Sequence, residues 1–280
     1  MRHEIVSRNP DVEVRFYLSV DEGSYVTPHW HDSIEMVYMI EGSIVISYEK
    51  HNREIGPGEF TVVNSRVIHS VLSAKNQALV LQIPKEVLRK YVPDVDNYMF
   101  DIVPHPKSKE EQARQEQIKK IFVEMQTIYN LRPKGYLLKF NSLLYDLLFT
   151  LIHSYSHKIV RNDFDRKSKY LERLNEIMAY LKKHYKERIV LSELAREFGY
   201  SPDYLARFFK KQTGMTMNEY LYAYRITKVH QELVNTDKTI QEIFEENGCT
   251  NYRVAMREFR KYYGCTPKQR RMQAGDGKVK

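Results

Sequence analysis

Cysteine is scarce in this chain, and long apolar runs are absent from it. The 280 residues include only two cysteines, Cys249 and Cys265, too few for a disulfide framework and wrongly placed for a zinc ribbon. No segment approaches the ~18 consecutive apolar residues that a membrane-spanning helix needs. The first residues, MRHEIVSRNPDVEVRF, contain no apolar core of a secretion signal. These absences predict a cytosolic protein with no membrane partner.

Negative charge is in deficit only in the second part of the sequence. Residues 1–165 carry 20 Lys and Arg against 22 Asp and Glu, a net charge of −2. Residues 166–280 carry 24 against 14, a net charge of +10. The length allows about two domains, and a basic domain beside a near-neutral one favours a polyanion partner, either nucleic acid or an anionic membrane surface. A basic domain that is merely soluble stays open as an alternative.

Short β-like segments fill the chain up to residue 83. They are rich in Val, Ile, Tyr and Phe, and turn signals such as DEGS, EGS and GPGE separate them. The segments are VEVRFYLSV, IEMVYMI, SIVISYE, EFTVVN and ALVLQI. Several short strands at this spacing predict a small barrel or sandwich over residues 1–83.

Helical periodicity begins at Pro84 and predicts a helical segment over residues 84–157. An apolar stripe runs along its second part, at Leu137, Phe140, Leu144, Leu147, Leu148, Leu151 and Tyr155. Burial against its own domain and a share in a dimer interface both explain a stripe this apolar. The polar residues 158–170 then predict a linker.

The basic part contains an internal repeat. LAREFGYSPDYLARFFKKQTGMT, from Leu194, aligns with IFEENGCTNYRVAMREFRKYYGCT, from Ile243. The matches at a spacing of fifty are Arg207, Phe209, Lys211, Gly214 and Thr216 with Arg257, Phe259, Lys261, Gly264 and Thr266. Gly199 recurs as Gly248 at a spacing of forty-nine, so the second turn is one residue longer. Chance agreement of this order is improbable, and a repeated structural unit is the economical interpretation.

Each copy has the pattern of a helix-turn-helix. In the first copy, Ala195 permits close helix packing and Gly199 permits a turn with positive φ. Ser201 is a good N-cap with proline directly after it. The second helix is expected to bury Leu205, Phe208 and Phe209 and to expose Asp203, Ala206, Arg207 and Lys210. A basic helix that starts at a sharp turn suits the major groove of DNA.

Capping boxes mark the starts of two further helices. Thr216 with Glu219 predicts the start of a connecting helix, and Thr239 with Glu242 predicts the start of the second copy. The connecting helix would hold two reading helices at a fixed separation. Two such helices one DNA turn apart, ~34 Å, can enter successive major grooves.

These segments resemble the DNA-binding domain of the AraC/XylS family of bacterial transcription regulators. The resemblance covers residues 171–272, within an expected domain of residues 171–275 whose motifs span about 190–213 and 239–263. It implies base contacts by Asp203, Ala206 and Arg207 in the first copy and by Tyr252, Arg253, Met256 and Arg257 in the second. It also implies phosphate contacts by Lys210, Lys211, Arg260 and Lys261.

The second copy departs from the family pattern in its core. The pattern favours Ala, Phe, Tyr and Phe where this chain has Phe244, Cys249, Val254 and Ala255. A large Phe244 facing a small Ala255 is a volume-conserving exchange, which protein cores tolerate. Whether this copy reads bases closely or mainly grips the DNA backbone stays open.

A second resemblance lies in the stretch GSYVTPHWHDSIEMVYMIEG. Gly23, His29, His31, Glu35 and Gly42 fit the first motif of the cupin superfamily. The two histidines and Glu35 share parity on a strand, so all three are expected to point into one barrel. His69 is placed to add a fourth ligand, and three histidines with one carboxylate suit Fe, Mn, Ni or Zn.

The second cupin motif is poor, which leaves three interpretations of the histidines. Metal cupins have Pro and Gly before the last histidine and Asn after it, whereas this chain has Asn64, Arg66 and Ser73. The leading interpretation is an effector pocket walled by His29, His31, Glu35 and His69, without a cofactor. The same four residues holding a divalent metal, and purely structural histidines, are the alternatives.

The sequence therefore predicts a multidomain α+β protein. It would have an N-terminal cupin-like β-barrel with a helical dimerisation segment and a C-terminal all-α double helix-turn-helix. The expected function is that of a homodimeric regulator, not an enzyme, that binds promoter DNA and a small-molecule effector. By resemblance it would be an activator that contacts RNA polymerase, responds to a sugar or glycoside and serves a carbohydrate-utilisation operon. The alternative is a metal-dependent cupin enzyme with an accessory basic domain.

Overall fold

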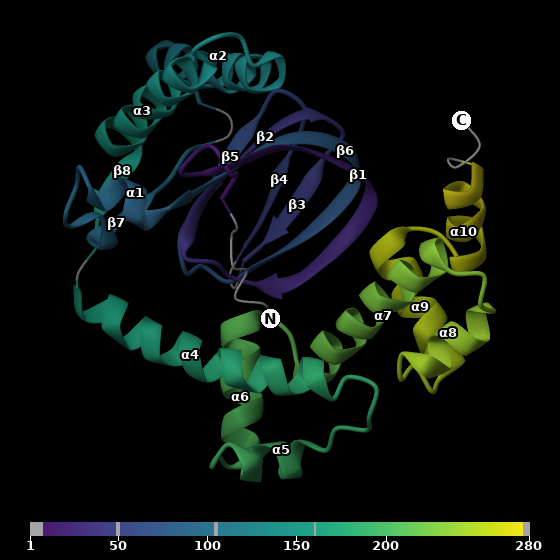
Figure 1. Ribbon diagram of the computed structural model, residues 1–280. Helices are drawn as coiled ribbons and strands as arrows, with labels where there is room; N and C mark the ends of the chain where they lie inside the picture. The colour runs from purple at the N-terminus through teal and green to yellow at the C-terminus, as the bar shows by residue number, and fades with distance from the viewer. Residues whose placement is uncertain (1–7, 49–50, 104–105, 160, 277–280) are drawn as a thin grey trace.

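The computed structural model describes residues 8–48, 51–103, 106–159 and 161–276. Its N-terminal region is a strongly curled six-stranded sheet (Figure 1). The strands are β1 (Arg15–His29), β2 (Ser33–Glu41), β3 (Ile44–Ser47), β4 (Asn52–Ile55), β5 (Phe60–Val63) and β6 (His69–Pro84). The expected cupin-like β region is confirmed.

β6 is the central strand of this sheet. One edge of β6 pairs with β1 over nearly its whole length, from Arg15 opposite Gln82 to His29 opposite His69. The other edge pairs first with β3 and then with β2. Two long antiparallel strands that curl together bring the start of β6 beside the end of β1, and His29 and His69 lie opposite each other there.

The sequence pattern missed β4 and underestimated the longest strands. β4 reads NREI, and only Ile55 among its residues is buried, so it has no apolar alternation to detect. β1 and β6 continue beyond their apolar stretches because their polar residues still pair in register across the ladder. Backbone pairing, which leaves no mark in hydropathy, sets the length of these two strands.

The two faces of the sheet have different roles. In β2, Ile34 and Met36 belong to the core that the sheet shares with the helices. Glu35 and Val37, on the alternate face, line an internal cavity. The period-two alternation of a strand thus separates a structural face from a cavity face within one segment.

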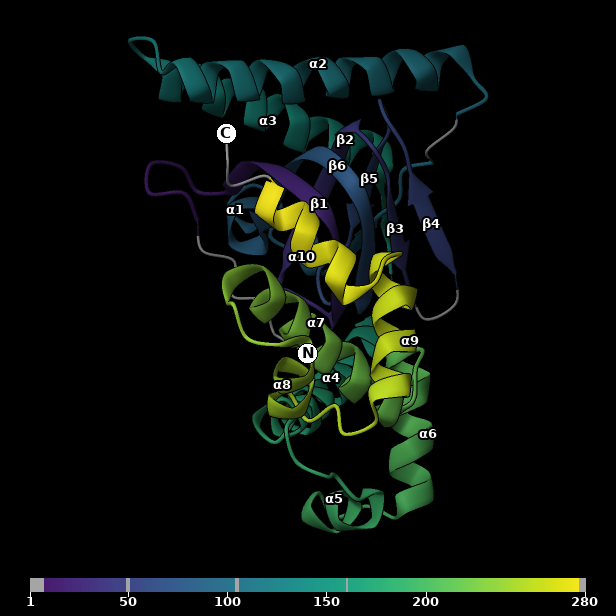
Figure 2. The same ribbon diagram turned by 90° about the vertical axis from the view of Figure 1, so that its right-hand side faces the viewer.

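A helical layer covers the outer face of the sheet (Figure 2). It follows α1 (Lys85–Arg89), a short 3-10 helix (Val95–Asn97) and β7 (Tyr98–Phe100), and consists of α2 (Lys109–Leu131) and α3 (Tyr136–Tyr155). The α3 stripe packs inward: Phe140 lies edge-on to Phe16 of β1, with 5.6 Å between ring centroids. Burial within its own domain is therefore the explanation of that stripe.

The polar segment expected to be a linker is largely helical. After β8 (Ser156–Lys158), a single helix, α4, runs over Arg161–Lys183. Residues 161–170 contain neither glycine nor proline, so nothing in the sequence interrupts the helix that continues to residue 183. The connection between the two regions is a helix rather than an irregular chain.

Short helices complete the C-terminal region. They are α5 (Leu191–Glu197), α6 (Pro202–Thr213), α7 (Met217–Asn235), α8 (Ile240–Glu246), α9 (Tyr252–Tyr263) and α10 (Pro267–Asp276). The expected caps are present: Ser201 caps α6, and complete capping boxes start α7 and α8. Gly199, Gly214, Gly248 and Gly264 all have positive φ at the turns. The double helix-turn-helix is confirmed.

Candidate functional sites

The first reading helix, α6, presents a basic face on a buried support. Leu205, Phe208 and Phe209 point into a core shared with α4 and α5. The predicted contact residues lie on the other side: Asp203, Arg207, Lys210 and Lys211 are exposed, and Ala206 is half-buried. The Arg207 Nε donates to the carbonyl oxygen of Asp203 at 3.3 Å. That weak contact leaves the guanidinium group on the surface.

The second reading helix, α9, has the same plan with other partners. Asn251 caps it by accepting from the Val254 N–H at 3.1 Å. Tyr252, Arg253, Arg257, Arg260 and Lys261 are exposed, and Met256 is half-buried. Arg257 is held in an ion pair with Glu258, with 3.0 Å between Nη2 and Oε1, and Lys261 lies 3.9 Å from the same carboxylate. Glu258 thus neutralises part of the predicted basic face.

The cores of the two copies have exchanged large and small residues. Ala195 and Leu205 occupy two positions of the first core, where the second core has Phe244 and Ala255. All four are buried, with exposures of 1% or less. In the second copy, Phe244 also meets Tyr252 edge-on at 5.4 Å. Full burial on both sides supports the volume exchange expected from the sequence.

The three histidines of the cupin motif come from different elements. His29 is the last residue of β1, His69 is the first residue of β6, and His31 lies in the connection between β1 and β2. The expected common strand for His29, His31 and Glu35 is therefore wrong, because the chain turns at residues 30–32. The pairing of His29 with His69 and the turn after β1 bring the rings together instead.

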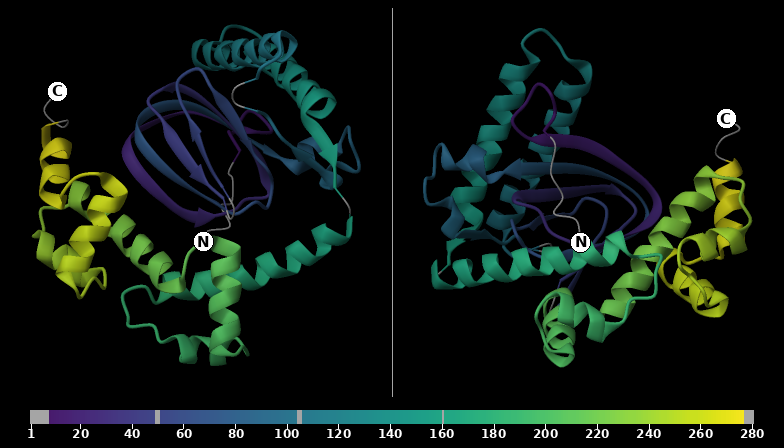
Figure 3. Two further views of the ribbon diagram at one scale, coloured as in Figure 1. Left: turned by 180° about the vertical axis from the view of Figure 1, so that it is seen from behind. Right: turned by 60° about the horizontal axis from the view of Figure 1, so that its bottom comes forward.

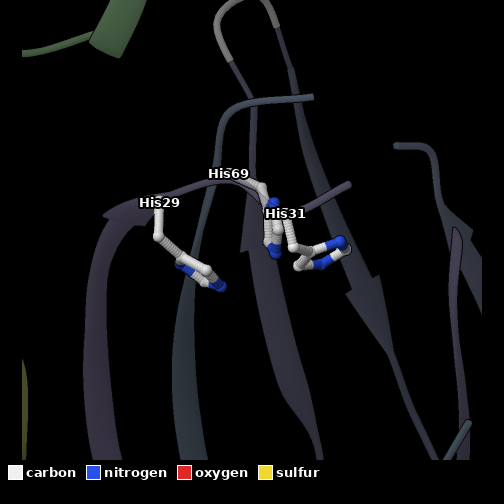
Figure 4. A group of neighbouring side chains, drawn as sticks. All are labelled: His29, His31 and His69. Atoms are coloured by element: carbon white, nitrogen blue, oxygen red, sulfur yellow. The ribbon is translucent and has the colours of Figure 1, made fainter. Parts of the chain in front are cut away.

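The three histidine side chains lie close together (Figure 4), and each ring makes the same kind of backbone contact. Each Nδ1 lies beside a backbone carbonyl oxygen: Thr27 O at 3.1 Å for His29, Ser33 O at 2.8 Å for His31, and Val67 O at 3.0 Å for His69. A carbonyl oxygen only accepts, so each Nδ1 carries the proton and each Nε2 carries a lone pair. The three candidate ligand nitrogens lie within 4.8 Å of one another.

Burial favours the neutral form of His29 and of His69. It lowers the pKa of His29 well below its usual range, and neighbouring His69 and His31 lower it further. Burial also lowers the pKa of His69 to about 4, against the opposing charge of Glu35. Neutral imidazole is the form that binds metal ions. Among the described residues, the His31 Nε2 and the His69 Nε2 are buried with no hydrogen-bond partner.

Glu35 lies beside the cluster and is oriented by a neighbour. Its Oε2 accepts a hydrogen bond from the Gln82 Nε2 at 2.6 Å and lies 3.5 Å from the His31 Nε2. Two orphaned imidazole nitrogens, three rings oriented through Nδ1 and an adjacent carboxylate fit a transition-metal site. His29, His31 and His69 would hold the ion, with Glu35 in reach, and the ion would act as a Lewis acid there.

A cavity of about 400 Å³ adjoins the histidines inside the curled sheet. Its wall combines apolar strand residues with polar ones. The polar lining residues are Tyr17, Ser19, Asp21, Thr27, His29, Glu35, Ser73, Asn76, Gln82 and Lys182. This volume lies within the range of small-molecule sites. His31 and His69 belong to the histidine cluster but not to this lining.

Sequence reasoning named only His29 and Glu35 of this lining, and the most distant residue that it missed is Lys182. It belongs to α4, whereas every other lining residue belongs to the sheet. Its position in the sequence, 100 residues beyond the last strand residue of the wall, carries no signal of this contact. The cavity is therefore shared between the two regions of the chain.

Comparisons with known proteins agree with both regions. Residues 194–273 match the family model of a helix-turn-helix domain, and residues 16–83 match that of a cupin domain. The chain joins a cupin domain to an AraC-type helix-turn-helix domain. The matched ranges contain all of the predicted DNA contacts and all four residues of the predicted effector site.

Relatives of this chain include much longer proteins. An uncharacterised HTH-type transcriptional regulator of Staphylococcus aureus is 23% identical over 246 residues, which are 86% of this chain and 31% of the relative. The uncharacterised HTH-type transcriptional regulator YtdP of Bacillus subtilis is 29% identical over 144 residues, 48% of this chain and 19% of the relative. The chain thus spans less than a third of the length of these two relatives.

Two solved structures are also similar. The C-terminal domain of the two-component response regulator yesN of Fusobacterium nucleatum is 32% identical, covers 35% of this chain and 95% of that one, and has a TM-score of 0.33. ToxT of Vibrio cholerae is 13% identical, covers 92% of this chain and 97% of that one, and has a TM-score of 0.48.

Within the described residues, no helix is long and apolar enough to cross a membrane.

Proposed function

We propose that this protein is a sequence-specific, DNA-binding transcription regulator whose cupin domain senses a small molecule. The observation that carries the proposal is the repeated reading helix. α6 and α9 each start at a capped turn, bury one face in a separate core and expose a basic face. An enzyme has no need of two such helices, whereas successive major grooves of DNA accept them.

Arg207 is the sharpest test of DNA binding. A bidentate contact from this arginine to guanine is worth ~1 to 3 kcal/mol, so Arg207→Ala should weaken binding to the upstream region of its own gene about 5- to 150-fold. Fluorescence anisotropy with labelled DNA at two salt concentrations measures the loss. Lys120→Ala, at an exposed position on α2, is the control and should bind like the parent protein. Equal affinity of the Arg207 variant and the parent would refute the role of α6.

The cavity is the proposed effector site. Its volume of about 400 Å³ and its many hydroxyl, amide and carboxylate groups suit a polar ligand, and a sugar or glycoside is the class we propose. His29 and Glu35 line this cavity, and His31 and His69, which lie beside His29, would complete the effector site. A thermal-shift screen of monosaccharides and glycosides tests the class. In His31→Ala the ligand-induced shift should disappear while DNA binding is retained; loss of both would indicate a folding defect instead.

An exposed apolar face of α3 supports the proposed homodimer. Leu138 and Phe149 are 80% and 70% exposed, and Tyr145 lies between them at helical spacing. Large apolar side chains exposed on the outer side of this helix favour association with a second copy. Sedimentation velocity of the parent protein and of Phe149→Glu distinguishes the outcomes. We expect a dimer that the substitution dissociates, and a monomeric parent protein would contradict the proposal.

Action in the cytoplasm, contact with RNA polymerase and control of a carbohydrate operon complete the proposal. They rest on the resemblance to AraC/XylS regulators. In vitro transcription with purified polymerase measures the sign of regulation: a rise in transcript on addition of the protein, abolished in Arg207→Ala, is expected for an activator. A fall in transcript would make the protein a repressor.

The histidine cluster favours a second candidate, a metal-dependent cupin enzyme. Three clustered imidazoles, with no hydrogen-bond partner at the Nε2 of His31 and of His69, and an adjacent carboxylate support this alternative. Elemental analysis of protein purified without chelators addresses the metal directly. Stoichiometric metal in the parent protein, lost in His31→Ala, together with failure to bind DNA, would favour the enzyme over the regulator.

A further inference from the structure

Trp30 connects the histidine cluster to the DNA-binding region. It lies between His29 and His31 in sequence, but its side chain points the other way. The indole ring is 6% exposed and packs in the core of the first helix-turn-helix, with Leu174 and Met178 of α4. Its Nε1–H donates to the Asn175 Oδ1 at 2.8 Å. A residue flanked by two candidate ligands is thus part of the α4 core.

The same stretch of β1 also contacts the second helix-turn-helix. Tyr25 stacks on Tyr262 of α9, with 4.3 Å between ring centroids and 22° between planes. Arg270 of α10 donates to the carbonyl oxygens of Glu22 and Gly23 at 2.9 Å each. We call residues 22–31 the docking segment, because both DNA-binding copies attach to the sheet through it. α7 and α9 both contact β1 (Figures 1 and 3).

The backbone of the docking segment also sets the positions of the histidines. The Nδ1 of His29 lies beside the carbonyl oxygen of Thr27, within the segment, and the Nδ1 of His31 lies beside that of Ser33. Moving the segment therefore moves the rings relative to His69 on β6. The position of the docking segment therefore determines both the geometry of the histidine cluster and the packing of Trp30 against α4.

We propose that occupancy of the three-histidine cluster by a divalent transition metal ion is thermodynamically linked to docking of the DNA-binding region, and that Trp30 carries the linkage. The inference rests on the proposed function, because it concerns regulation of the same sensor domain. When docked, the docking segment holds His29 and His31 beside His69 of β6, so an ion bound to all three stabilises docking. The linkage is reciprocal: the factor by which a bound ion favours docking equals the factor by which docking raises the affinity for the ion. Loosening the docking contact should therefore weaken metal binding.

Asn175→Ala tests the linkage without touching a ligand. It removes the hydrogen-bond partner of Trp30 from α4, while all three histidines stay in place. Binding of Zn²⁺ to the full chain is measured by competition with a chromophoric chelator. We expect an affinity at least fivefold lower than that of the parent protein, the lower end of typical coupling factors. Arg173→Ala, at an exposed position on α4 where Arg173 faces Glu176 at 3.7 Å, is the matched control and should leave the affinity unchanged.

Trp30 is the single tryptophan of the chain, so its fluorescence reports docking directly. Zn²⁺ does not quench fluorescence through unpaired electrons, because its d shell is full. In Asn175→Ala the emission should be red-shifted, since the indole gains exposure, and one equivalent of Zn²⁺ should shift it back toward the emission of the parent protein. In Asn175→Ala combined with His69→Ala the second shift should be absent.

The outcomes separate this inference from the proposed function. If the parent protein binds no Zn²⁺, or if Asn175→Ala binds it with unchanged affinity and unchanged emission, the linkage is refuted. Neither result bears on DNA binding, which is measured with metal-free protein and the Arg207→Ala variant. Conversely, if the metal-free protein does not bind DNA, the proposed function as a regulator is refuted, whereas the linkage of metal binding to docking is not.

Discussion

The two helix-turn-helix copies have the same backbone plan, yet the basic residues on their exposed faces differ in whether an acidic neighbour pairs with them. The difference originates at one repeat position, where α6 has Phe208 and α9 has Glu258. Phe208 is buried in the first core. Glu258 is half-buried and pairs with Arg257 and Lys261. A single exchange of an apolar residue for an acidic one thus gives Arg257 an ion-pair partner that Arg207, at the equivalent position of α6, does not have there.

The two copies also differ in how tightly their turns are surrounded. A Cβ on Gly199 would meet nothing within 4 Å, whereas a Cβ on Gly248 would lie 2.7 Å from the Lys186 carbonyl oxygen. The second copy is therefore packed against the chain that leaves α4, and the first turn is open to solvent. We therefore expect the first copy to contribute more to base recognition than the second.

The largest expected effect concerns the exchanged core pair. Phe244→Ala should lower the free energy of unfolding by ~3 to 5 kcal/mol, because it opens a cavity beside the small Ala255. Chemical denaturation followed by circular dichroism measures the loss. A loss below 1 kcal/mol would show that Phe244 and Ala255 do not share one packed contact. Phe244→Leu, which retains most of the volume, is the control.

The turn glycines give the next comparison. Gly248→Ala should cost about 3 kcal/mol of unfolding free energy, because positive φ strain adds to a backbone clash. Gly199→Ala should cost about 1 kcal/mol, since it carries only the strain of a left-handed alanine. Equal losses in denaturant titrations of the two variants would contradict the tighter packing of the second turn.

His230 gives the second copy a pH dependence of its own. Burial, and then the charge of Arg270, lower the pKa of His230 to about 4. The unfolded chain takes up this proton from pH 6.5 downward, so stability falls as the pH drops from 6.5 toward 4. The loss between pH 7 and pH 5 should be about 2 kcal/mol. His29 and His69 add losses of the same sign, so the difference between the parent protein and His230→Gln isolates this contribution.

His230→Gln is a suitable comparison because an amide oxygen can replace the acceptor. The His230 Nε2 accepts a hydrogen bond from the Arg270 Nε at 2.9 Å. Gln retains an acceptor and does not titrate. A pH profile of the variant that parallels that of the parent protein would mean that His230 does not change its protonation on unfolding.

The smallest effect concerns the paired arginine of α9. Arg257→Ala should weaken DNA binding by less than 1 kcal/mol, because breaking an ion pair offsets part of the gain from a DNA contact. Glu258→Gln should tighten DNA binding slightly by releasing both cations. Anisotropy titrations of these two variants and of Arg207→Ala show which copy contributes more to the affinity for DNA. A loss in Arg257→Ala as large as that in Arg207→Ala would abolish the proposed asymmetry.

Local chemistry made much of this structure predictable. Ser201, Thr216 and Thr239 cap helices through their own side chains, and Gly199 and Gly248 supply turns, so short sequence signals sufficed there. The cupin motif, with His69, indicated the three histidines whose side chains lie together in the structure, although His31 lies outside the expected strand. The contacts of Trp30, Lys182 and Glu258 join segments or neighbours with no periodic pattern, and only the folded chain reveals them.

A hydroxyl-radical footprint of the protein on the DNA upstream of its gene is the most direct test of the central claim. If α6 and α9 enter successive major grooves, two protected patches should appear one helical turn apart on one face of the DNA. Protection should be lost at the α6 patch first in Arg207→Ala. The absence of any protected patch, at protein concentrations that shift the DNA, would contradict a sequence-specific double helix-turn-helix.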